Sequence, residues 1–109
     1  MAEAQPDVEL TVVLAVFEAR TGRIEALGAL LARYVVLTRR AQECRNVDLV
    51  ASVIERGRFV VIEKWESAAA QRSHMDAPET VALAEDCRDL LSGAPRFDLC
   101  DAVSAHDLT

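Results

Sequence analysis

The chain has 109 residues, 51% of them hydrophobic and 28% charged, with a formal net charge of −6. This length suits one small core, so we expect a single domain over residues 1–109 whose ordered part spans about 8–103. The acidic balance and the dispersed arginines argue against a nucleic-acid partner, because a phosphate backbone would be repelled. No apolar run approaches a bilayer span and the start does not resemble a secretory signal, so we expect no membrane partner and a cytoplasmic location.

Metal-ligating and phosphate-binding patterns are missing from the sequence. The three cysteines and two histidines show neither C-x-x-C nor H-x-x-x-H spacing, which favours unpaired thiols in a reducing compartment and no dedicated metal site. No glycine-rich loop of the kinds that bind nucleotides occurs either. We therefore expect neither a dedicated metal site nor a nucleotide cofactor.

The first half of the chain predicts a strand, a long helix and a hairpin. Residues 8–17 are β-branched and apolar between turn signals, as in a strand. Thr21 is placed to cap a helix whose apolar residues recur at helical spacing as far as Arg40. Residues 46–55 and 58–65, separated by a turn that contains glycine, then predict two antiparallel strands.

The second half predicts two helices and a last strand. A short, alanine-rich helix is expected over residues 67–75. Asp76 as N-cap and the early Pro78 open another helix, which Ser92-Gly93 ends. The residues expected on its inner face are Val81, Ala84, Cys87, Leu90 and Leu91. Alternation over 96–103 indicates a strand, and the remaining residues a tail.

The element order β-α-β-β-α-β predicts the ferredoxin-like α+β fold, a four-stranded antiparallel sheet with helices on one face. The first strand is apolar on both sides: one face has Val8, Leu10, Val12, Leu14 and Val16, and the other has Val13, Ala15 and Phe17. The helices of one chain can cover only one of these faces. A second copy of the chain would cover the other, so we expect a homodimer.

A more specific pattern follows the hairpin. It is Glu63-x-Trp65-x-Ser67, with His74 nine residues after the only tryptophan. With the surrounding elements, this stretch resembles the antibiotic biosynthesis monooxygenase family over about residues 8–103. The family includes cofactor-free oxygenases of aromatic polyketides, quinol monooxygenases, haem-degrading enzymes and proteins without known activity. The resemblance implies a dimeric α/β barrel that oxidises a quinol or hydroxylated aromatic without a cofactor.

The sequence departs from the family's patterns at several positions. Residues 41–44 read Ala-Gln-Glu-Cys where members commonly carry Glu-Pro-Gly-Cys, and Val47 stands at a position that is often tyrosine. Two polar positions of the anthrone-oxidising branch correspond to Val61 and Gln71. Ala84 occupies the place of the iron-binding histidine in the haem-degrading branch. Haem turnover by that route is therefore not expected.

Cofactor-free oxygenation requires an apolar pocket, a base and a donor that stabilises an anion, because the substrate anion itself reduces dioxygen. Five residues are candidates for these roles: Trp65 as pocket wall and His74 as base, with Tyr34, Arg39 and Glu63 as substrate-binding residues.

Each candidate also has an ordinary structural interpretation. Trp65 and Tyr34 are equally typical of core packing, His74 of an exposed helix face, and Glu63 of an ion pair on a sheet. A non-catalytic dimer of the same fold that binds a small apolar ligand therefore stays open as the alternative function.

Overall fold

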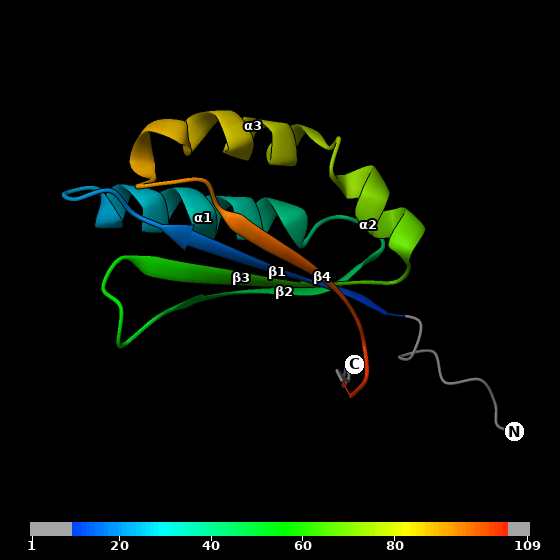
Figure 1. Cartoon of the computed structure of the whole chain (residues 1–109). Coiled ribbons are helices and arrows are strands. Elements are labelled where there is room, and N and C mark those ends of the chain that lie inside the picture. Colours follow the sequence, from blue (N-terminus) through cyan, green and yellow to red (C-terminus); the bar gives the residue numbers. More distant parts are fainter. Residues whose placement is uncertain (1–9, 105–109) are drawn as a thin grey trace, which may run out of the picture.

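The computed structural model describes residues 10–104 and contains eight elements (Figure 1). In chain order they are β1 (Thr11–Glu18), α1 (Ile24–Thr38), β2 (Cys44–Ala51), β3 (Arg58–Trp65), α2 (Ala68–His74), α3 (Pro78–Asp86), the short 3-10 helix η2 (Arg88–Leu90) and β4 (Arg96–Asp101). The predicted first-strand residues 8 and 9 and most of the predicted tail lie outside the described residues.

The four strands form one antiparallel sheet in the order β2-β3-β1-β4. This confirms the ferredoxin-like fold. β1 is central because it is the most apolar strand, and it pairs with β3 from Thr11↔Trp65 to Glu18↔Arg58. In this register Val13 lies opposite Glu63 and Ala15 opposite Val61, so these residues share one face of the sheet.

The helices lie on that same face (Figure 1). Side chains at helical spacing on α1 point toward the sheet. The sequence pattern predicts six inner residues on this helix, and all except Ile24 are buried: Leu27, Leu31, Tyr34, Val35 and Thr38. The core between helices and sheet contains Ala15, Phe17, Leu27, Leu31, Tyr34, Val35, Val47, Val61, Leu83, Cys87 and Leu91. No helix in the described part of the chain is long and apolar enough to cross a membrane.

Both predicted helix caps are wrong. Thr21 lies in a turn closed by a hydrogen bond from Arg23 N to Arg20 O, and α1 begins after Arg23 without a side-chain cap. Ala77, not Asp76, precedes α3, with Pro78 at its first position. In each case the residue that the sequence pattern predicts as the helix cap is part of a local turn instead.

Two element ends also differ from the prediction. β2 ends at Ala51 rather than at 55, because the Ser52 hydroxyl accepts hydrogen bonds from the backbone N–H groups of Ile54 and Glu55. α3 ends at Asp86, and on it Val81 is 49% exposed whereas Leu83 is buried. The chain between α3 and β4 instead pairs with the end of β1.

The opposite face of the sheet carries no helix in residues 10–104 (Figure 1). The register places three pairs of β1 and β3 residues along its middle: Val12 with Lys64, Leu14 with Ile62, and Val16 with Val60. On β4 the partners of these positions are Cys100, Asp98 and Arg96. The face therefore has an apolar centre and a charged margin.

Candidate functional site

Four elements bring polar side chains together beneath the helices. Glu63 comes from β3, Tyr34 from the inner face of α1, His74 from the end of α2, and Thr80 from the first turn of α3. Ser67 sets the direction of α2, because its hydroxyl accepts a hydrogen bond from Ala70 N at the start of that helix.

Glu63 is the acceptor at the centre of this group. The Tyr34 hydroxyl donates to Glu63 Oε2 over 2.6 Å, and the Trp65 indole N–H donates to Glu63 Oε1 over 2.9 Å. The Glu63 residue is only 6% exposed, so both bonds replace lost water contacts. Each carboxylate oxygen keeps a second lone pair for another donor.

His74 lies next to this carboxylate group and is buried. Its Nε2 atom is 3.0 Å from the Tyr34 hydroxyl and 3.0 Å from the Thr80 hydroxyl. The Thr80 hydroxyl also donates to the His74 carbonyl over 2.7 Å. Because each hydroxyl has one proton and both are already donated, Nε2 carries the imidazole proton and donates to these oxygens.

The other side of the His74 ring is turned away from these hydroxyls. Its Nδ1 is 3.6 Å from Glu79 Oε2, and the ring lies against the Trp65 indole with centroids 4.5 Å apart. With Nε2 protonated, Nδ1 is the atom that accepts a further proton. His74 therefore orients Tyr34 and Thr80 with one nitrogen and can be charged at the other.

Burial alters the acidity of two members of the group. Burial lowers the pKa of His74, and the nearby Glu63 and Glu79 carboxylates oppose that shift only in part. Burial, followed by the charge of Glu63 and the hydrogen bond to it, raises the pKa of Tyr34 well above its usual range. At neutral pH Tyr34 is therefore a hydrogen-bond donor and His74 is uncharged.

The chain contains a single tyrosine, so its titration is directly observable. We expect no tyrosinate absorbance from the native protein at pH 10.0, the ordinary pKa, because ionisation would place a second anion beside Glu63. Above that pH the stability should decrease, since the unfolded chain releases the proton first. Ultraviolet titration in buffer and in denaturant checks this, and an unshifted native midpoint would contradict it.

Trp65 is the only tryptophan and its indole contacts His74, so its fluorescence should report the charge of the imidazole. Because the folded pKa is lowered from 6.5, we expect quenching by the imidazolium only below pH 6.5. Below 6.5 the unfolded chain binds the proton more readily, so the free energy of unfolding should fall as pH falls. His74→Gln should abolish the fluorescence step, whereas a midpoint at or above 6.5 would contradict this placement.

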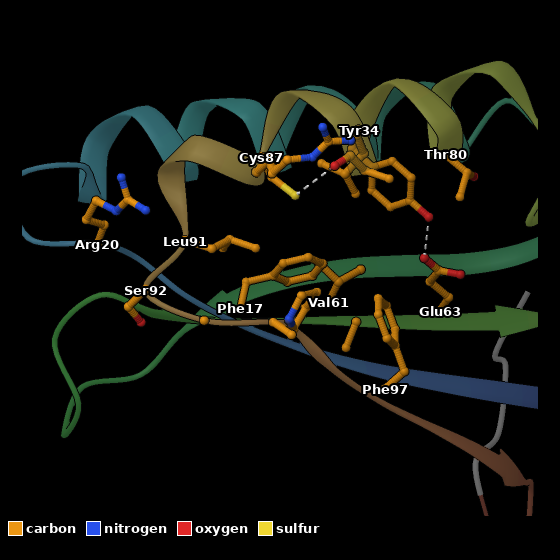
Figure 2. A pocket seen from close by; sticks show the side chains of 17 residues that line it. Phe17, Arg20, Tyr34, Val61, Glu63, Thr80, Cys87, Leu91, Ser92 and Phe97 are labelled. Carbon is orange, nitrogen blue, oxygen red and sulfur yellow. Dashed lines mark hydrogen bonds between the residues drawn. The ribbon is translucent and has the colours of Figure 1, made fainter.

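A cavity of about 510 Å³ lies between the sheet and α3, beside these polar groups (Figure 2). Three of them line it: Glu63, Tyr34 and Thr80. Its other lining residues are Ala15, Phe17, Arg20, Val61, Leu83, Ala84, Cys87, Arg88, Leu91, Ser92, Gly93, Ala94, Pro95 and Phe97. Cavities of this volume are in the range that accommodates small organic molecules.

The structure therefore brings four of the five predicted site residues together but does not give them equal access to the cavity. Tyr34 and Glu63 line it, whereas His74 and Trp65 lie behind them and contact the cavity's polar residues. Arg39 lies elsewhere: its Nε donates to Val47 O over 3.1 Å, and its side chain is 52% exposed beside Asp48.

Sequence reasoning missed several lining residues. Thr80 comes shortly after the proline that opens α3 and belongs to no recognisable motif. Arg20 and Arg88 are 68 positions apart, so no local sequence pattern connects these two arginines. Ala84, at the place of the haem-degrading branch's ligand, lines the cavity with a methyl group. Burial raises the pKa of Cys87, so this lining thiol stays protonated.

Residues 10–104 contain no group of three or more metal-binding side chains.

Solved structures with the same fold come from several bacteria. Rv0793 from Mycobacterium tuberculosis has a TM-score of 0.82 and 26% identity, over 88% of this chain and 97% of that one. PA3566 from Pseudomonas aeruginosa has a TM-score of 0.81 and 23% identity, over 88% and 96%. SnoaB, described as a cofactor-independent oxygenase from Streptomyces nogalater, has a TM-score of 0.78 and 18% identity, over 89% and 96%.

No curated protein sequence matches the chain. The family model described as antibiotic biosynthesis monooxygenase matches residues 11–86, which span β1 to α3 and include Tyr34, Glu63, Trp65, His74 and Thr80. The chain belongs to the antibiotic biosynthesis monooxygenase family.

Proposed function

We propose that this protein is a cofactor-independent monooxygenase that oxidises a quinol or hydroxylated aromatic compound. The observation that carries the proposal is the apolar cavity of about 510 Å³ with a buried carboxylate, Glu63, and a neutral phenol, Tyr34, at one end. The family match and the description of SnoaB as a cofactor-independent oxygenase support it.

The reaction balances without an added reductant. A hydroxylated aromatic gives up a hydroxyl proton, and the resulting electron-rich anion transfers one electron to dioxygen. The substrate radical and superoxide combine into a carbon–oxygen bond, and the protonated peroxide breaks its O–O bond. The substrate has then gained one oxygen atom and lost two hydrogen atoms, and the second oxygen atom leaves as water.

Glu63 takes the substrate proton in this proposal, because it is the carboxylate that lines the cavity. When Glu63 becomes protonated, the Tyr34 hydroxyl no longer faces an anion and can donate to the new substrate oxyanion instead. His74, our sequence-based candidate for the base, enters as a positioning residue that holds Tyr34 and Thr80. Trp65 fixes Glu63 through its indole N–H.

The proposal includes a homodimer, formed through the helix-free face of the sheet, in the cytoplasm. The apolar centre of this face, with Leu14 beside Ile62 and Val16 beside Val60, favours burial against a second copy. Light scattering should give twice the 11.9 kDa mass of one chain at micromolar concentration. Ile62→Glu should give the monomer mass, and a monomeric native protein would contradict the proposed interface.

A second function has one observation in its favour. Every hydrogen of the Tyr34, Trp65 and Thr80 donors already has an internal acceptor, as in a purely structural buried network. In that case the cavity binds a small aromatic ligand without turnover.

Oxygen uptake separates the two functions. Purified protein, treated with a chelator and free of flavin, is mixed with 1-naphthol, 1,4-dihydroxynaphthalene or anthrone in an oxygen electrode. The proposed function predicts uptake above autoxidation that scales with protein concentration. Saturable binding of these compounds without added uptake would establish the ligand-binding alternative.

A further inference from the structure

A smaller groove lies between α1 and α3, which pack against each other on the sheet (Figure 1). Its volume is about 70 Å³. Four residues of α1 line it at helical positions i, i+3, i+4 and i+7: Leu30, Arg33, Tyr34 and Leu37. Residues of α3 from Glu79 to Asp86 line it with the same spacing. Each set occupies one face of its helix, so two matching stripes face each other across the groove.

One of these stripes carries a small side chain. Ala82 presents only a methyl group to the groove, whereas Leu30 and Leu83 have larger side chains. Packed helices usually fill such a gap with interdigitating side chains. The charged lining residues Arg33 and Asp86 are exposed and Leu83 is buried. The groove is therefore polar toward solvent and apolar toward the core.

The groove and the cavity of about 510 Å³ share a wall. Tyr34 and Leu83 line both spaces. The Tyr34 hydroxyl is fixed by its 2.6 Å hydrogen bond to Glu63. Leu83 has no polar side-chain atom and belongs to the apolar core, where leucine side chains still change rotamer. Leu83 is therefore the part of the wall that can move and connect the two spaces.

The size and the inner lining of the groove suit a small, uncharged molecule. Organic ligands occupy cavities of about 300–1,000 Å³, so a ring compound does not fit in about 70 Å³. Apolar spaces in proteins bind small apolar species such as xenon. Dioxygen is the reactant of this kind in the proposed reaction, and it requires no hydrogen-bond partner.

The larger cavity reaches solvent at a different place. Ser92, Gly93 and Ala94 line it and are exposed. Figure 2 shows Ser92 and Glu63 at opposite ends of the cavity. An aromatic substrate that enters past Ser92 and reaches Glu63 blocks this route behind it. The groove adjoins the Glu63 end, because its lining residue Tyr34 is hydrogen-bonded to Glu63.

We propose that dioxygen reaches the bound substrate through the groove between α1 and α3, with Leu83 as the gate. The inference rests on the proposed function in taking dioxygen as the second substrate. The groove gives dioxygen its own access to the Glu63 end while the aromatic substrate occupies the larger cavity.

Nuclear magnetic resonance under oxygen pressure tests the groove without turnover. Dioxygen is paramagnetic, so it accelerates the relaxation of the protons that it approaches. In the substrate-free native protein, we expect an enhancement about threefold larger for the methyl groups of Leu30 and Leu37 than for those of Leu49, which is also half-buried but lines neither space. Ala82→Phe fills the groove and should abolish this difference.

The oxygen dependence of turnover tests the route. Ala82 lines the groove but not the cavity. Ala82→Phe should therefore lower kcat/KM for dioxygen about tenfold and change KM for the aromatic substrate less than twofold. Leu37→Phe narrows the same groove from α1 and should act in the same direction.

Ala32→Phe is the matched control, because Ala32 is exposed on α1 and lines neither space. It should keep the native oxygen kinetics. The ultraviolet titration of Tyr34 should be the same in all three variants, which checks that its hydroxyl stays on Glu63.

Equal relaxation enhancement at Leu37 and Leu49 would overturn the inference. Native oxygen kinetics in both Ala82→Phe and Leu37→Phe, or an equal loss in Ala32→Phe, would also overturn it. Enhanced relaxation in the groove without any oxygen uptake would instead refute the proposed function and leave the groove as a site for a small apolar gas.

Discussion

Glu63→Gln is expected to lower the turnover number of oxygen uptake by about 100- to 10,000-fold, the range typical of losing a general base. Glu63 is the carboxylate that lines the cavity, and the amide of glutamine cannot accept the substrate proton at neutral pH. The side chain keeps its shape, so substrate affinity should change far less than turnover. Steady-state kinetics with the best substrate of the oxygen-electrode panel measures both quantities.

The Glu63→Gln variant should still fold. Its amide oxygen can accept from the Trp65 N–H, and its amide nitrogen can donate to the rotatable Tyr34 hydroxyl. We expect a loss of at most about 1 to 3 kcal/mol in the free energy of unfolding. Glu66→Gln, the same change at an exposed residue just after β3, is the matched control and should retain full turnover. Full turnover in Glu63→Gln would show that Glu63 is not the proton acceptor.

Trp65→Ala is expected to cause the largest loss of stability, about 3 to 5 kcal/mol. Trp65 is 1% exposed at the end of β3 and is among the largest fully buried side chains. Its removal leaves a cavity, deprives His74 of its stacking partner and removes one of the two donors to Glu63. Urea denaturation, followed by circular dichroism because the fluorophore is gone, measures the change.

Trp65→Phe separates packing from hydrogen bonding. Phenylalanine keeps an aromatic ring beside His74 but has no N–H for Glu63. We expect a smaller destabilisation than in Trp65→Ala, together with a clear loss of turnover because Glu63 is less well oriented. If Trp65→Ala cost less than about 1 kcal/mol in the free energy of unfolding, the indole would not contribute the packing that its burial indicates.

The order of the strands and helices was predictable because apolar periodicity is strong in this chain. β1 is apolar on both faces, and the inner residues of α1 recur every three or four positions. The ends of the helices were less predictable, because the same residue types favour both helix caps and local turns. The pairing of Ala19 with Leu91 and the hydrogen bond from Arg20 N to Leu90 O draw the chain after α3 toward β1, so that helix ends early.

The candidate site was predictable only where one strand carries the signal. Glu63 and Trp65 are two positions apart on β3 and therefore share the face beneath the helices. His74, expected to face solvent or to act as base, is 7% exposed, because α2 turns its ring onto Trp65. Arg39 comes directly after α1 in the sequence, yet its side chain lies against β2, where its Nε donates to a backbone carbonyl. Thr80 reaches the group only through the packing of α3.

The most direct test uses ¹⁸O-labelled dioxygen with anthrone and the chelator-treated protein. The proposed reaction predicts one labelled oxygen atom in the quinone product and one in water, at a rate that Glu63→Gln reduces and Glu66→Gln does not. Product oxygen derived from water, or labelling at the rate of anthrone autoxidation alone, would contradict the assignment of this cavity as an oxygenase site.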